Sequence, residues 1–221
     1  MKVGREIGYT FGMAETIGVF GGTFDPPHLG HLILAGEAFS QLQLDRLLWV
    51  LTPDPPHKPL QPVAVLRHRR EMLTRAIANV PNFELSTVEI DREGPHYTAD
   101  TLDILQQRLP LAKLVLLIGA DSLENLPKWF HPREIVTSAY ALGVMRRPGV
   151  EINFSTLEEK IPGISNKVRF IDTPQLEISS STIRERIATG GHYRFYLHPG
   201  VYDYIQQHLL YRPLFSDPHN P

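Results

Sequence analysis

The stretch from Gly18 to His31, GVFGGTFDPPHLGH, constrains this chain more than any other. It begins inside an apolar run of strand length at 16–20 and opens into a periodic apolar segment at 29–42, which is typical of a helix. Because Gly21 and Gly22 lack Cβ atoms, the backbone between the two segments can take positive φ and approach a ligand closely. The pattern therefore predicts a strand, a tight turn and a helix.

Such a turn places unpaired N–H groups and the positive end of a helix dipole at one spot, which favours a phosphate. His28 and His31 lie three residues apart in the first helical turn, so both imidazoles face that spot. Gly30 between them is expected to leave room for a bulky ligand. The alternatives are two histidines without a ligand, or a zinc pair; zinc needs three or four ligands, and the sequence has no cysteine and no obvious third partner.

Composition narrows the class of protein. The chain has 221 residues, of which 42% are hydrophobic and 21% charged, as in an ordinary globular protein. The absence of cysteine excludes a disulfide framework and a thiol nucleophile. No continuous apolar segment reaches membrane-spanning length, and the first twenty residues hold no apolar core of a signal peptide. A net charge of −2 argues against a broad nucleic-acid surface. We expect a cytoplasmic protein without nucleic-acid or membrane partners; a homo-oligomer is left open.

Apolar runs of strand length alternate with helical segments along the rest of the chain. The predicted strands are 16–20, 46–52, 83–90, 113–119, 140–146 and 167–172. The predicted helices are 29–42, 65–80, 97–109, 133–139, a segment near 157, 180–189 and 200–211. This alternation predicts an α/β fold, a doubly wound, Rossmann-like parallel sheet with helices on both faces and a small helical C-terminal piece.

The domain is expected at 16–212. Residues 1–15 form either a disordered extension or a segment ahead of a true start at Met13, and the tail 213–221 is expected to be loose. Ligands of doubly wound sheets bind beyond the carboxyl ends of the strands. The turns after Phe20, Thr52, Ile90 and Gly119 should therefore converge on one crevice.

A second motif, ISSSTIR at 178–184, places four hydroxyl side chains ahead of a predicted helix. The simple alternative is a capping box, because Glu185 follows Thr182 by three residues. The number of hydroxyl groups, together with Arg184 one turn into the helix, favours a second anion site that holds a polyphosphate tail.

Together the two motifs resemble the GGTFDPxHxGH and ISSTxIR signatures of the nucleotidylyltransferase superfamily, and in detail those of bacterial nicotinate-nucleotide adenylyltransferases. Ser181 stands where threonine is usual, which keeps the hydroxyl. The resemblance covers roughly 16–210 and implies that His28, His31 and Arg184 are catalytic. It implies ATP-binding roles for Gly21, Gly22, Thr23, Phe24, Gly30, Gly119, Asp121, Ile178, Ser179, Ser180 and Ser181.

Two further stretches are similar to the substrate side of that family. PHYTADTL at 95–102 resembles its YTxxTL segment, in which Thr98 would receive a nicotinate ring. GADSLENLPKW at 119–129 resembles its GxDxLxxLxxW run, in which Trp129 would stack on the pyridine and Asp121 would reach a ribose; without the resemblance, Trp129 is an ordinary core residue. Lys58 resembles the basic residue for the mononucleotide phosphate. Phe130 stands where the family often has tyrosine.

The resemblance implies adenylyl transfer from ATP to nicotinate mononucleotide in NAD biosynthesis, giving nicotinate adenine dinucleotide and pyrophosphate. No covalent enzyme intermediate is needed, because the attacking phosphate is already an anion. In this hypothesis His31 donates to the α-phosphate, and His28 and Arg184 hold the β- and γ-phosphates. No residue is predicted to ligate a metal; Mg²⁺ would bridge phosphate oxygens of ATP.

Three alternatives share part of this pattern. A related nucleotidylyltransferase with nicotinamide mononucleotide or phosphopantetheine as acceptor would keep the ATP motifs, so only the Thr98 and Trp129 regions argue against it. A nucleotide-binding regulator without catalysis would be expected to have lost a histidine or Arg184. A relative of the class I aminoacyl-tRNA synthetases would need a tRNA-binding domain, which the sequence does not indicate.

Overall fold

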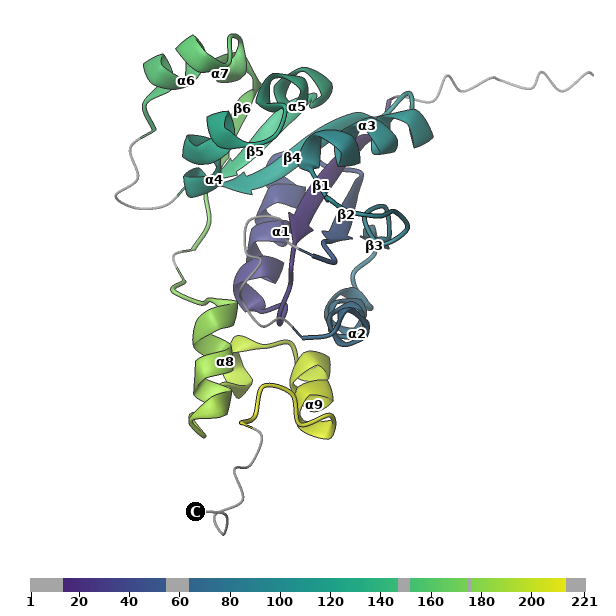
Figure 1. The fold of residues 1–221 in the computed structure, drawn as a ribbon, viewed down its shortest axis with the longest axis vertical. Coiled ribbons are helices and arrows are strands. Elements are labelled where there is room, and N and C mark those ends of the chain that lie inside the picture. The colour runs from purple at the N-terminus through teal and green to yellow at the C-terminus, as the bar shows by residue number, and fades with distance from the viewer. Residues whose placement is uncertain (1–13, 55–63, 147–151, 175, 214–221) are drawn as a thin grey trace, which may run out of the picture.

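The computed structural model describes residues 14–54, 64–146, 152–174 and 176–213 (Figure 1). Within these ranges six parallel strands form one sheet in the order β3-β2-β1-β4-β5-β6. The strands are β1 (Thr16–Gly22), β2 (Arg46–Leu51), β3 (Phe83–Ser86), β4 (Lys113–Gly119), β5 (Ala141–Met145) and β6 (Val168–Ile171). This strand order and the parallel pairing confirm the predicted doubly wound, Rossmann-like α/β fold.

Helices cover both faces of the sheet, and each face has its own apolar core. On one face pack α1 (Leu29–Gln41) and α2 (Leu66–Ile77), and the apolar core of this face extends to α8 (Ser180–Ala188) and α9 (Pro199–Gln207). On the other face pack α3 (Thr98–Arg108), α4 (Ala120–Asn125), α5 (Pro132–Ser138), α6 (Phe154–Lys160) and α7 (Ile164–Lys167). In Figure 1, α8 and α9 lie together at the end of the molecule below α1 and α2.

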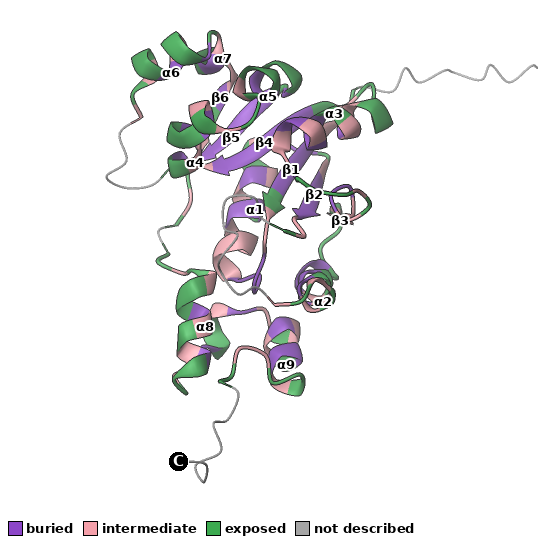
Figure 2. Ribbon diagram, viewed as in Figure 1, coloured by how far each residue is buried: buried purple, intermediate pink, exposed green. Residues whose placement is uncertain are grey.

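The middle strands are apolar on both sides because both of their faces are covered. In β4 the five residues from Leu114 to Ile118 are all buried, and Figure 2 shows the strands at the centre of the sheet in the colour of buried residues. The strand order reverses between β1 and β4, which pair from Thr16 to Val19. The carboxyl ends of these two strands therefore border the crevice at which such sheets bind ligands.

Several predicted elements are shorter than expected, among them the helix predicted at 65–80, which spans Leu66–Ile77, and two more that stop well before their predicted ends. The strand predicted at 83–90 stops at Ser86, because Thr87 begins a turn in which its carbonyl accepts the Asp91 N–H at 2.9 Å and its hydroxyl donates to the Asp91 carboxylate at 2.7 Å. The helix predicted at 200–211 ends at Gln207, and Tyr211 has a φ of 64°. The short helix α7 was not predicted.

Both ends of the described chain are held to the domain. Glu15 forms an ion pair with Arg46 at 2.8 Å, and its carbonyl accepts the N–H of Lys113 at 2.8 Å. The expected extension otherwise lies outside the described residues, as does nearly all of the expected loose tail. In the described part of the chain, no helix has the length and apolar character needed to cross a membrane.

Candidate active site

The loop after β1 carries the two predicted histidines into the start of α1. His28 is the N-cap residue, and its backbone N–H donates to Nδ1 of His31 at 3.2 Å. The two rings are stacked, with centroids 3.7 Å apart and planes 25° from parallel. Burial lowers the pKa of His28 to about 4, and burial together with the neighbouring His28 lowers the pKa of His31 well below its ordinary value. Both imidazoles are therefore neutral near pH 7.

Gly22 and Gly30 make room for protein side chains, whereas a Cβ on Gly21 would meet nothing within 4 Å. Neither Gly21 nor Gly22 has a positive φ, so that expectation was wrong; the positive φ of this turn, 46°, belongs to Phe24. A Cβ on Gly22 would lie 2.9 Å from the Phe24 ring. A Cβ on Gly30 would lie 3.0 Å from Nδ1 of His28, so the space beside Gly30 holds the His28 imidazole and not an open ligand cavity.

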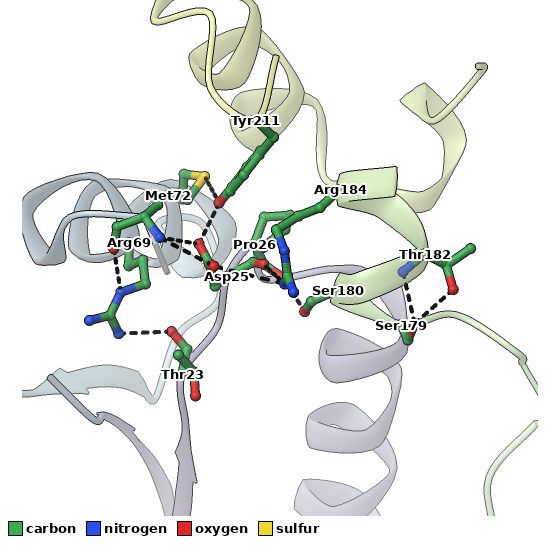
Figure 3. Close-up of polar contacts among 11 residues, drawn as sticks. Thr23, Asp25, Pro26, Arg69, Met72, Ser179, Ser180, Thr182, Arg184 and Tyr211 are labelled. Carbon is green, nitrogen blue, oxygen red and sulfur yellow. Dashed lines mark hydrogen bonds and ion pairs between the residues drawn. The ribbon is translucent and has the colours of Figure 1, made fainter. Parts of the chain in front are cut away.

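The second motif docks directly on this loop, as Figure 3 shows. The helix α8 begins after Ser179, whose hydroxyl accepts the Thr182 N–H at 3.1 Å, so the cap is one turn earlier than the predicted Thr182–Glu185 box. Ser180 donates its hydroxyl to the Pro26 carbonyl at 2.9 Å. Arg184 donates from Nη1 to the Asp25 carbonyl at 2.7 Å, and the same nitrogen lies 3.8 Å from the Asp25 carboxylate.

The structure therefore brings the two predicted helix starts together. Asp25 and Pro26 stand three and two residues before His28, and Ile178 lies beside the first turn of α1, with its Cβ 3.8 Å from where a Cβ of Gly30 would be. Ser181 is exposed at the start of α8. Imidazoles from one helix start and hydroxyls with a guanidinium from the other thus border one region of the surface.

Three residues that sequence reasoning missed hold this region in place. Arg69 is 2% exposed and donates from Nη1 to the carbonyls of Thr23 at 3.1 Å and Thr52 at 2.7 Å. Asp25 is 4% exposed and accepts the Tyr211 hydroxyl at 2.7 Å. Burial raises the pKa of Tyr211, and the neighbouring Asp25 carboxylate raises it further. The Tyr211 hydroxyl therefore stays protonated and donates.

A pocket of about 210 Å³ opens beside the end of β1. Residues at the carboxyl ends of β1, β2 and β4 and in the turn after β3 line it, among them Gly21, Thr52, Ile118 and Glu89, so these strand ends border one crevice. Thr98, at the start of α3, and Trp129 also line the pocket, as the predicted substrate residues should. The ring of Phe130, another lining residue, is stacked on Tyr97 with centroids 4.2 Å apart.

The remaining predicted residues fall in different places. Gly119 is the N-cap residue of α4 and Asp121 lies in the first turn of that helix, next to the pocket wall at Ile118 but not in its lining. Lys58 lies outside the described residues. The pocket lining also includes three buried polar residues that were not predicted as site residues, Glu89, His96 and Thr101.

The fold and the two facing helix starts are those of α/β nucleotidyltransferases. A family model described as cytidylyltransferase-like matches residues 19–186. The nicotinate-nucleotide adenylyltransferase of Bacillus subtilis is 40% identical over 197 residues, which are 89% of this chain and 98% of that protein. The chain therefore belongs to the cytidylyltransferase-like family and, within it, to the nicotinate-nucleotide adenylyltransferases.

Solved structures agree on the fold. The nicotinic acid mononucleotide adenylyltransferase of Plasmodium falciparum in complex with NaAD superposes with a TM-score of 0.73 at 23% identity. The same protein in complex with APC superposes with a TM-score of 0.72 at 22% identity. Each comparison covers 89% of this chain and 97% of the Plasmodium chain.

Proposed function

We propose that this protein transfers the adenylyl group of ATP to nicotinate mononucleotide, giving nicotinate adenine dinucleotide and pyrophosphate in NAD biosynthesis. Its relationship to enzymes of that name supports the reaction. The observation that carries the proposal for this chain is that one segment, residues 21–31, contributes both to the pocket and to the helix start beside α8. Gly21, Gly22 and Thr23 line the pocket with Thr98 and Trp129, and a few residues later the same segment presents His28 and His31 beside the start of α8.

The main contribution that this reaction requires from the protein is to align the two reactants. The phosphate of the mononucleotide attacks the α-phosphorus of ATP, a new P–O bond forms, and the bond to pyrophosphate breaks with both electrons leaving on its oxygen. Holding the two reactants in line is worth ~7–11 kcal/mol in favourable cases. No proton has to be removed from the nucleophile, so no general base is required.

Charge stabilisation is the second requirement, and the two helix starts supply it. We assign His31 as the donor to the α-phosphate, and His28 with Arg184 as donors to the β- and γ-phosphates. The lowered pKa values keep both imidazoles neutral, so each ring carries a single N–H. Thr23, Ser180 and the exposed Ser181 are proposed as further donors.

The pocket suits the flat ring of the acceptor. An indole face at Trp129 and the apolar walls at Val50 and Ile118 favour an aromatic ring, and Thr98 adds a hydroxyl at the start of α3. This composition favours a pyridine nucleotide over phosphopantetheine, whose acceptor arm is a flexible chain. The pocket itself does not separate the acid from the amide mononucleotide.

We propose that Mg²⁺ enters as the complex with ATP. Within the described ranges no group of three or more histidine, cysteine, aspartate or glutamate side chains is placed to hold a metal ion. The residues proposed to face the triphosphate are donors, which suits phosphate oxygens rather than a cation. A cytoplasmic location accords with this substrate pair and stays a prediction.

A dinucleotide-formation assay tests the function. ATP with Mg²⁺ is offered with nicotinate mononucleotide, nicotinamide mononucleotide or phosphopantetheine, and pyrophosphate release is followed. We expect the highest kcat/KM with the acid mononucleotide. Turnover of phosphopantetheine alone would overturn the acceptor assignment, and ATP binding without turnover on any acceptor would favour the regulator alternative.

A further inference from the structure

We propose that Glu89 is a specificity-determining residue that supplies a counter-charge to the cationic pyridinium ring of the acceptor. The inference rests on the proposed function and deepens it. The nitrogen of a pyridine nucleotide is bonded to the ribose, so the oxidised ring carries a permanent positive charge. A pocket for such a ring gains selectivity from a nearby fixed negative charge.

The position of Glu89 fits this role. The side chain follows β3 in the turn at 87–91, is 5% exposed, and is the one acidic side chain in the pocket lining, among the residues that the structure describes. Oε1 accepts the hydroxyl of Thr101 at 2.7 Å. Oε2 is buried without a hydrogen-bond partner in the described part of the protein. One carboxylate oxygen is thus held in place, while the other is buried beside the pocket and has no hydrogen-bond partner among the described residues.

Glu89 makes no direct ion pair with any of the described residues. The nearest basic side chain in its network is Arg92, which reaches it only through Thr101, donating from Nη2 to that hydroxyl at 3.4 Å. Arg92 also donates from Nη1 to the carbonyl of Pro95 and from Nη2 to that of Tyr97, and its Nε is buried without a partner in the described part of the protein. The described residues place no lysine or arginine in the pocket lining, and His96 is its only basic group. A buried carboxylate without a close counter-ion favours a cationic ligand strongly.

A purely structural role is the alternative. In that case Glu89 would only accept the Thr101 hydroxyl and fix the start of α3. The two roles differ in one measurable respect: a structural defect weakens every ligand of the pocket alike, whereas a counter-charge acts on charged rings and not on neutral ones. Nicotinate mononucleotide and its 1,4-dihydro form provide the pair of probes, since they share ribose, phosphate and carboxylate and differ in ring charge.

The experiment measures Kd for both probes by calorimetry without ATP, in wild type, Glu89→Gln and Asp103→Asn. Asp103 is an exposed carboxylate on α3 outside the pocket, so its variant controls for net charge. We expect wild type to bind the oxidised form more tightly. We expect Glu89→Gln to reduce that preference on the order of tenfold and Asp103→Asn to leave it unchanged.

Equal changes in both Kd values, or no change, in Glu89→Gln would overturn the inference. If Glu89→Gln does not fold, the two Kd values of wild type test the inference by themselves. Equal or tighter binding of the reduced form by wild type would contradict a counter-charge. The proposed function is judged separately, by turnover of wild type with ATP and nicotinate mononucleotide. Normal turnover with an unchanged preference removes only the role of Glu89.

Discussion

Arg69 holds together three segments that form the floor of the candidate active site. Besides its bonds to the carbonyls of Thr23 and Thr52, it donates from Nη2 to the Pro53 carbonyl at 2.5 Å and from Nε to the Ala64 carbonyl at 2.9 Å. Burial lowers its pKa, and the Asp25 carboxylate opposes that effect, so the buried guanidinium remains charged. Removing the side chain leaves four carbonyls without this donor.

The cost of Arg69→Met follows from these bonds. A hydrogen bond to a charged group contributes ~1.5–3 kcal/mol, but the contributions are not additive, and burying a guanidinium itself costs several kcal/mol. Methionine recovers part of the apolar contact of the stem. We therefore expect a loss of about 3–5 kcal/mol in the free energy of unfolding.

Urea unfolding followed by circular dichroism measures this loss. The matched control is Arg70→Met, the same change on the next residue of α2, which is exposed. The control should stay within about 0.5 kcal/mol of wild type. If Arg69→Met costs less than about 1 kcal/mol, or no more than the control, the four bonds do not hold the loops and the reasoning is refuted.

Three further predictions concern the histidine pair. His31→Ala should lower turnover by 10²–10³ while the thermal midpoint is kept, and near-native turnover in a folded variant would remove His31 from the chemistry. Gly30→Ala should push the His28 ring out of its stack and lower kcat/KM about tenfold. Its control is Gly36→Ala, whose added Cβ meets nothing within 4 Å and which should keep activity and stabilise α1 by about 1 kcal/mol. Equal kinetics in the two variants would contradict the steric argument. His28 has a pKa of about 4 in the folded protein and of about 6.5 when unfolded, so the unfolded state binds the extra proton first as the pH falls. The free energy of unfolding should therefore fall by about 3 kcal/mol between pH 6.5 and 4. Chemical denaturation at each pH should show a shallower fall for His28→Asn.

Much of the fold could be predicted because the central strands are buried on both faces. The run at 113–119 contains five consecutive apolar residues and matched β4 at both ends. The prediction failed where tertiary context decides the ending. Val88 and Ile90 continue the alternation of β3, yet they belong to a turn, because β3 pairs only with β2 and that pairing ends at Ser86.

The site was predictable where one short segment carries the chemistry and not where distant residues complete it. Arg69 stands in the run RHRR at 67–70, which is typical of a solvated helix face. The missed signal was its spacing, since Met72, Leu73 and Ala76 follow at helical intervals on the same buried face. Glu89 gave no comparable signal, because only the fold brings the turn after β3 to the pocket.

The hydrogen bond from Tyr211 to Asp25 has a consequence for folding during synthesis. The two residues are 186 positions apart, and the acceptor carboxylate also takes part in the contact with Arg184. A chain that emerges from the ribosome N-terminus first has its glycine turn early, but it lacks the hydroxyl that binds this turn until residue 211 has emerged. Nascent chains that stop before Tyr211 should therefore be unable to fix the loop between β1 and α1 in its final conformation.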